Sequence, residues 1–305
     1  MATAAPSPTT PATYTAVPLE GLAGREQVPF PLYLRTADNV WVLYRPSASV
    51  VDDGHIGRLV AEGVHNLYIR DVDRDAYFAR VEKVIDRVLL DRSMPLERRA
   101  DVLHGVAVRV ADDVLAAMPD QAVLQRAQKV MMATSGLLLR ESQGFRAVRR
   151  VMGASHGLAT HSLGTSFLSL GLARALGADA GTLLQAGLAG LLHDVGKVGH
   201  EALDHDPEHA VRGAEYLRTL GLPAAIVEAA RSHHERIDGS GYPGQLTGRR
   251  IPELAQIVGL CDQFEEIYSQ QEPRVGVYDA LRILAQLHRG AFAEPLAQAF
   301  VRLFR

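Results

Sequence analysis

The pattern of hydrophobic and polar positions divides the chain into a strand-rich part and a longer helical part. Two short runs rich in aromatic and β-branched residues, 32–34 and 40–44, flank Asp38-Asn39, which predicts a β-hairpin with its turn there. A short helix is expected over 56–64 and a strand over 67–69. Apolar residues then recur at helical spacing between 75 and 90. Together these patterns predict a small α+β unit.

Strand patterns end at Pro95, and an all-α region is expected after it. Helices are predicted over 96–118 and 121–140, separated by Pro119-Asp120, and helical patterns broken by glycine and proline continue from about 145. Residues 1–18 are rich in Pro, Ala, Thr and Ser, so we predict a disordered tail over 1–24. An N-terminal regulatory or sensory domain is expected over 25–145 and a histidine-rich domain over 146–305. The helices between 96 and 140 could belong to the domain on either side of this boundary, or could form a dimer contact.

Composition narrows the classes of protein. The formal net charge of the 305 residues is -3, which argues against long nucleic acid as the main partner. Cys261 is the single cysteine, so a disulfide scaffold and a cysteine-based zinc site are excluded. No apolar run approaches the roughly 20 residues that span a bilayer, and the uncharged start lacks the basic region of a signal peptide. A cytoplasmic protein without a membrane partner is therefore expected.

Histidines are concentrated in one stretch, since eight of the 12 lie between His156 and His234. His193-Asp194 ends one apolar helical pattern, and His233-His234-Glu235 ends another. Burying such groups without partners is expensive, and imidazole and carboxylate are ligands of divalent transition metals. A metal site is one interpretation of each cluster, and a polar helix end with hydrogen-bonded histidines is the other.

Several motifs in order resemble the HD-GYP family, a branch of the HD metal-dependent phosphohydrolases. They cover about 150–285 and comprise His161-Ser162, His193-Asp194-Val195-Gly196-Lys197, His209, His233-His234-Glu235, Asp238-Gly239-Ser240-Gly241-Tyr242-Pro243 and Asp262. The resemblance implies an all-α domain that hydrolyses the bacterial second messenger cyclic di-GMP to linear pGpG, and in some members on to GMP. It also implies two or three bound metals, often iron or manganese.

The resemblance assigns roles position by position. One metal would be held by His161, His193, Asp194 and Asp262, and the other by Asp194, His209, His233 and His234. Asp194 and Lys197 are expected to be catalytic, with Asp194 bridging two metals that activate a shared water. Lys197 would offset charge on the phosphate. Substrate contacts are expected from Lys197, Gly241, Tyr242, Pro243 and Arg274.

Two positions depart from the family pattern. Gly157 lies four residues before His161, where three-metal members carry a glutamate, so a two-metal site is expected. Neighbouring His156 is the residue that could substitute, although a surface role suits it better. Gln271 stands in place of an arginine that contacts the nucleotide in the family, and a neutral amide cannot form a charged bidentate pair. Arg274, close by, could compensate.

Three functions therefore stay open. The first is a dinuclear cyclic di-GMP phosphodiesterase. The second is a degenerate member that binds cyclic di-GMP as a sensor, which Gln271 favours and the intact ligand set opposes. The third is an HD phosphohydrolase acting on another small phosphorylated substrate, which the Gly-Tyr-Pro segment opposes. A homodimer contact or a protein partner is a further expectation for the N-terminal region, where no motif specifies it.

Overall fold

The structure is a computed structural model that describes residues 13–22, 26–36, 40–151, 157–200, 206–270 and 275–305. Contacts divide the chain into two units, Met1–Asp91 and Arg92–Arg305. The first unit contains β1 (Tyr14–Pro18), η1 (Leu19–Gly21), β2 (Gln27–Val28), β3 (Leu32–Arg35), β4 (Trp41–Arg45), β5 (Ser49–Val50), α1 (Asp53–Ala61), β6 (Asn66–Arg70), η2 (Asp71–Asp73) and α2 (Arg74–Leu90).

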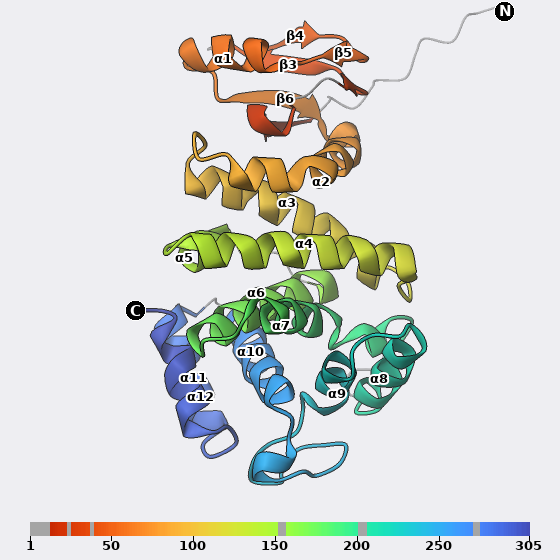
Figure 1. Cartoon of the computed structure of the whole chain (residues 1–305), viewed down its shortest axis with the longest axis vertical. Coiled ribbons are helices and arrows are strands. Elements are labelled where there is room, and N and C mark those ends of the chain that lie inside the picture. The colour runs from red at the N-terminus through yellow and green to blue at the C-terminus, as the bar shows by residue number, and fades with distance from the viewer. Residues whose placement is uncertain (1–12, 23–25, 37–39, 152–156, 201–205, 271–274) are drawn as a thin grey trace, which may run out of the picture. The chain divides into compact units, whose positions relative to one another are not determined.

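The second unit is helical within the ranges that the structure describes (Figure 1). It contains α3 (Leu96–Leu115), α4 (Gln121–Arg140), α5 (Gly144–Val151), α6 (Leu158–Ala175), α7 (Ala180–Leu192), η3 (Val195–Lys197), α8 (His209–Thr219), α9 (Ala224–Ser232), η4 (Gly248–Arg250), α10 (Glu253–Gln270), α11 (Val277–Leu287) and α12 (Glu294–Arg302). The predicted fold class, a small α+β part followed by an all-α part, is confirmed.

The N-terminal unit is built on an antiparallel four-stranded sheet in the order β1-β6-β3-β4. The predicted hairpin is confirmed, because β3 pairs with β4 and Tyr33 lies opposite Leu43. Its predicted turn at Asp38-Asn39 lies outside the described residues. Strand β6 pairs with β1 along its whole length and also joins β3. A separate two-stranded sheet joins β2 and β5.

The prediction of a disordered tail over 1–24 is wrong for residues 13–22, which belong to the core of this unit. Val17, in β1, is 1% exposed, and Leu19 and Leu22 are fully buried in the η1 turn. The backbone of β1 pairs with β6, so the strand does not require an apolar side chain at every position. The strand was not predicted from the sequence, because the Thr and Pro residues that flank its apolar residues are typical of a disordered segment. The rest of the predicted tail lies outside the described residues.

Helices α3 and α4 pack on α6 and α7, so the observed division at Asp91 differs from the predicted boundary at residue 145. Val106 and Val110 of α3 and Val130 of α4 are at most 1% exposed, which gives both helices a buried apolar face within this unit. The predicted break before α4 is explained by Asp120, which caps that helix by accepting a hydrogen bond from the Val123 N–H at 2.9 Å.

The centre of the second unit is formed by α6, α7 and α10, which pack on one another (Figure 1). Helix α6 is buried on nearly all sides, as expected for an internal helix. Helix α7 approaches it closely at Gly190, where an added Cβ would lie 2.6 Å from the Cα of Ser166. This core positions the polar ends of α7 and α9. Among the described residues, no helix combines the length and apolarity needed to cross a bilayer.

Cys261 is fully buried on α10, and burial raises the pKa of its thiol. A buried thiol has little thiolate and little access to reagent, so we expect the folded chain to react with DTNB about 100-fold more slowly than the unfolded chain. The absorbance of released thionitrobenzoate, followed with and without guanidinium chloride, measures this ratio. Equal rates would mean that α10 opens readily to solvent.

Candidate metal centre

The His-Asp pair lies where α7 ends inside the apolar core. His193 is fully buried and Asp194 is 1% exposed. The preceding turns of α7 bury Leu188, Leu191 and Leu192, so the pair has little water around it. A carboxylate in such surroundings requires cationic or hydrogen-bonding partners, since an isolated buried charge is very costly.

The structure brings together all seven residues that the resemblance assigned as metal ligands. They come from α6, the end of α7, the start of α8, the end of α9 and the middle of α10. They form two groups, and within each group the possible ligand atoms all lie within 4.8 Å of one another. The first group is Asp194, His209, His233 and His234, and the second is His161, His193 and Asp262.

Asp194 lies between the two groups, and its two oxygens face different members. Its Oδ1 atom is 3.2 Å from His209 Nε2 and 3.8 Å from His233 Nε2. Its Oδ2 atom is 3.4 Å from His193 Nε2 and 3.8 Å from His161 Nε2. The carboxylate therefore spans the two groups, which is the arrangement required of a bridging ligand.

Backbone carbonyls determine which ring nitrogen of these histidines faces the centre. The Nδ1 atoms of His193 and His233 donate to the carbonyls of Gly190 and Ala230, each at 2.8 Å, and His209 Nδ1 contacts the Asp206 carbonyl. A carbonyl oxygen only accepts, so Nδ1 carries the proton in each ring. In the neutral rings, Nε2 then offers a lone pair to the centre, as a metal ligand must.

The ring nitrogens of the first group lie close to one another, and in His209 and His233 both Nε2 atoms are acceptors. His209 Nε2 is 3.4 Å from His233 Nε2 and 3.2 Å from His234 Nε2. His193 Nε2 and Asp194 Oδ1 are buried and have no hydrogen-bond partner within the described part of the chain. Facing acceptors and orphaned polar atoms are unfavourable in a dry site unless a cation lies between them. The donor set therefore fits divalent cations.

The protonation tendencies differ between the two groups. Burial opposes protonation of His193, but the carboxylates of Asp194 and Asp262 outweigh it and raise its pKa to about 9. Burial lowers the pKa of His234 to about 3 and that of His233 well below its ordinary value. Without a cation, a proton thus resides beside the carboxylates of the second group. Cation binding there would displace it.

Glu265 is a functional residue that our sequence reasoning missed. Its carboxylate contacts His161 Nδ1 and accepts a hydrogen bond from Ser269 Oγ at 3.1 Å. This contact orients the ring, whose Nε2 lies 3.0 Å from Asp262 Oδ1. Gly164 leaves room for it, because a Cβ there would lie 2.8 Å from Glu265 Cγ. The available signal was spacing: Glu265 follows Asp262 by three residues and so shares its helix face.

Replacing Glu265 with glutamine is expected to weaken metal affinity about 10- to 100-fold, because the neutral amide no longer holds His161 as a carboxylate does. Competition with a chelator of known affinity measures this change. Glu253→Gln, an exposed position on the same helix, is the matched control and should bind metal as the native chain does. If the native chain and both variants bind metal with equal affinity, Glu265 does not position His161 for metal binding.

Glu235 is a second residue to which sequence reasoning gave no role. It is 3% exposed, and its carboxylate accepts hydrogen bonds from the N–H groups of Gly244, at 2.5 Å, and Leu246, at 2.8 Å. These bonds hold the Gly-Tyr-Pro segment against the end of α9. Gly241 must lack a side chain, because a Cβ would lie 2.3 Å from the His234 carbonyl oxygen.

The Gly-Tyr-Pro segment adjoins the first group of ligands. Tyr242 stacks on the ring of His234, with centroids 4.5 Å apart and an interplanar angle of 23°. The peptide bond between Tyr242 and Pro243 is cis, and Pro243 is exposed. Lys197 is half-exposed, and its Nζ atom lies 2.6 Å from Asp194 Oδ2. Burial opposes its charge, but Asp194 outweighs burial and raises the pKa of Lys197.

Four residues from the sequence predictions remain. Gly157 precedes α6, has a φ of +132° and faces open space, so it supplies no ligand. His156, Gln271 and Arg274 lie outside the described residues. The predicted substrate contact from Arg274 therefore stays a prediction.

Comparison with known proteins agrees with this fold. Residues 158–267 match the family model of the HD domain. An HDG"Y"P protein from Bdellovibrio bacteriovorus has a similar fold, with a TM-score of 0.68 at 20% identity over 96% of this chain and 99% of that chain.

Part of the chain is similar to curated proteins named as phosphodiesterases of cyclic dinucleotides. A cyclic di-GMP phosphodiesterase of Pseudomonas aeruginosa is 33% identical over 184 residues, which are 55% of this chain and 44% of the relative. A 3′3′-cGAMP-specific phosphodiesterase of Vibrio cholerae is 31% identical over 129 residues, 38% of this chain and 30% of the relative. The chain spans less than half the length of each of these relatives.

Proposed function

We propose that this protein hydrolyses cyclic di-GMP to linear pGpG, with two divalent cations, iron or manganese, as cofactors. The proposal depends on the position of Asp194, whose two oxygens face two separate groups of imidazoles, the second of which also contains the Asp262 carboxylate. Relatives named as phosphodiesterases of cyclic dinucleotides support the substrate class.

His161, His193, Asp194 and Asp262 would hold one cation, and Asp194, His209, His233 and His234 the other. When bound, such cations lower the pKa of water and stabilise charge on a phosphoryl group. The backbone hydrogen bonds of His193, His209 and His233 direct their Nε2 atoms inward before any cation arrives. Glu265 does the same for His161.

The remaining side chains provide the substrate's surroundings. A pocket opens beside His234 and Tyr242 and is also lined by Arg236, Ser240 and His288. Arg236 is 8% exposed and donates to the His233 carbonyl at 2.9 Å, so this cation is part of the pocket wall. The ammonium group of Lys197, next to Asp194, can hold a phosphate oxygen of the scissile bond near the cations.

The direct test uses the purified chain, with metal content measured first. Cyclic di-GMP is then incubated with iron- or manganese-loaded protein, and products are separated by chromatography, with 3′3′-cGAMP and bis(p-nitrophenyl) phosphate as comparison substrates. We expect pGpG and faster turnover of cyclic di-GMP than of either comparison. Faster turnover of 3′3′-cGAMP would contradict the proposal that cyclic di-GMP is the preferred substrate.

Binding without hydrolysis is the second candidate, because Gln271 replaces a charged nucleotide contact. The same experiment separates the two: submicromolar binding by calorimetry with no product from the metal-loaded chain would support a sensor and exclude the phosphodiesterase.

Lys197→Gln is expected to lower kcat for cyclic di-GMP about 100-fold, because the variant loses a charged donor to the phosphate. Metal content should be unchanged, since lysine is not among the proposed ligands. Lys129→Gln on α4 is the control and should retain native kcat. A Lys197 variant with native kcat would exclude this residue from the chemical step.

A further inference from the structure

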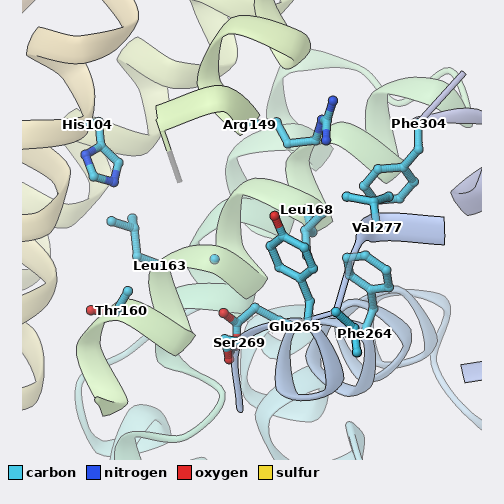
Figure 2. Close-up of a pocket in the computed structure, with 13 residues that line it drawn as sticks. His104, Arg149, Thr160, Leu163, Leu168, Phe264, Glu265, Ser269, Val277 and Phe304 are labelled. Carbon is cyan, nitrogen blue, oxygen red and sulfur yellow. Dashed lines mark hydrogen bonds between the residues drawn. The ribbon is translucent and has the colours of Figure 1, made fainter. Parts of the chain in front are cut away.

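Glu265 also lines a cavity that contains none of the proposed metal ligands (Figure 2). Its volume is about 140 Å³. The walls come from α3, α5, α6, α10 and α11 and from Phe304, and they are mostly aliphatic and aromatic: Leu163, Leu168, Phe264, Tyr268, Val277 and Phe304. An apolar cavity of roughly 150 Å³ accommodates one benzene ring. The cavity therefore has the size and lining for a single-ring compound.

Arg149 places a cation at the wall of this apolar space. Its guanidinium carbon lies 5.5 Å from the centre of the Phe304 ring, and both side chains border the cavity in Figure 2. Its Nε atom is buried without a hydrogen-bond partner, and no acidic residue within the described ranges forms an ion pair with it. A partly buried guanidinium without an anion is a ready partner for a carboxylate.

The other polar groups at the cavity do not compete for that anion. The Glu265 carboxylate is engaged with His161 and Ser269. Burial lowers the pKa of His104, which leaves its ring neutral near pH 7. Arg149 is therefore the one fixed positive charge among the lining residues, most of which are apolar.

We propose that this cavity binds a small aromatic monocarboxylate, with the ring among Leu168, Phe264 and Phe304 and the carboxylate on Arg149. One ring fits the volume, and one negative charge fits the single cation. The cavity contains no proposed metal ligand, and it adjoins the metal centre through Glu265, which contacts His161.

Sodium benzoate titrated into the full chain by calorimetry at constant ionic strength tests the proposal. We expect submillimolar binding with one site per chain. Benzamide, which keeps the ring but not the charge, should bind about tenfold more weakly or worse, since hydrogen bonds to charged groups are worth more than neutral ones. Acetate, which keeps the charge but not the ring, should not bind measurably. Undetectable binding of benzoate, or equal binding of benzamide, would overturn the proposal.

Three variants locate the site. Arg149→Gln should weaken benzoate binding about tenfold or more and leave benzamide unchanged. Arg146→Gln, exposed on the same helix, is the matched control and should bind benzoate as the native chain does. Val277→Phe places a ring in the cavity and should abolish binding of both compounds; Val277 is only half-buried, so the fold should tolerate it, and circular dichroism checks this. Native binding of benzoate by folded Val277→Phe would place benzoate elsewhere and overturn the proposal.

Discussion

Asp194→Ala is expected to remove metal from both groups of ligands and to lower hydrolysis of cyclic di-GMP by roughly a thousandfold or more. The carboxylate is within 3.8 Å of histidines in each group, so its removal deprives both of an anionic ligand. It also leaves Lys197 without its partner at 2.6 Å. The loss should exceed that from any single histidine variant, because each histidine belongs to one group only.

Elemental analysis of the dialysed protein and the rate of pGpG formation measure the two effects. Asp113→Ala, on the surface of α3, is the control for loss of a carboxylate. Metal content and turnover that both stay at native values in Asp194→Ala would show that the centre is not a metal site. Retention of one metal with loss of turnover would assign Asp194 to one group rather than to both.

Removing the cations is expected to destabilise the chain markedly. A cation present at about 100 times its Kd contributes about 2.7 kcal/mol per site to the free energy of unfolding. For a domain of this size, that corresponds to a Tm change of roughly 5–10 °C per site. Without cations, the inward lone pairs of His209 and His233 repel each other inside a buried site. We therefore expect EDTA to lower Tm and manganese to restore it.

Calorimetric melting before and after chelation, with re-addition of metal, measures this effect. Calcium is the matched control, because it prefers oxygen ligands and should restore neither Tm nor turnover. If EDTA removes the metal and Tm does not change, the proposal that bound cations stabilise the fold by separating the facing histidine nitrogens is wrong.

Local signals in the chain were sufficient to predict most elements of the fold. The run of aromatic and β-branched residues at 40–44 and the helical spacing at 75–90 correspond to β4 and α2. The break at Pro119-Asp120 corresponds to a capped helix start. The strand at Tyr14–Pro18 was missed because its stability comes from backbone pairing with β6, some 50 residues later. The division at Asp91 was missed because it depends on which helices share a core.

The candidate site shows the same limit. His193-Asp194 and His233-His234 were conspicuous because polar pairs ended apolar helices, and the family resemblance then indicated which distant residues accompany them. Glu265 and Glu235 carried no such signal, since their partners are a histidine more than 100 residues away and two backbone N–H groups. Residues that hold ligands and loops in place become visible only when the tertiary contacts are known.

The backbone before α6 also constrains how the site could change in evolution. Gly157 has a φ of +132°, a conformation that side chains other than glycine rarely adopt. A single substitution to glutamate would therefore place a carboxylate on a strained main chain rather than restore the glutamate found in three-metal proteins. A glutamate ligand at this position would therefore require a different backbone conformation at residue 157 in addition to the substitution.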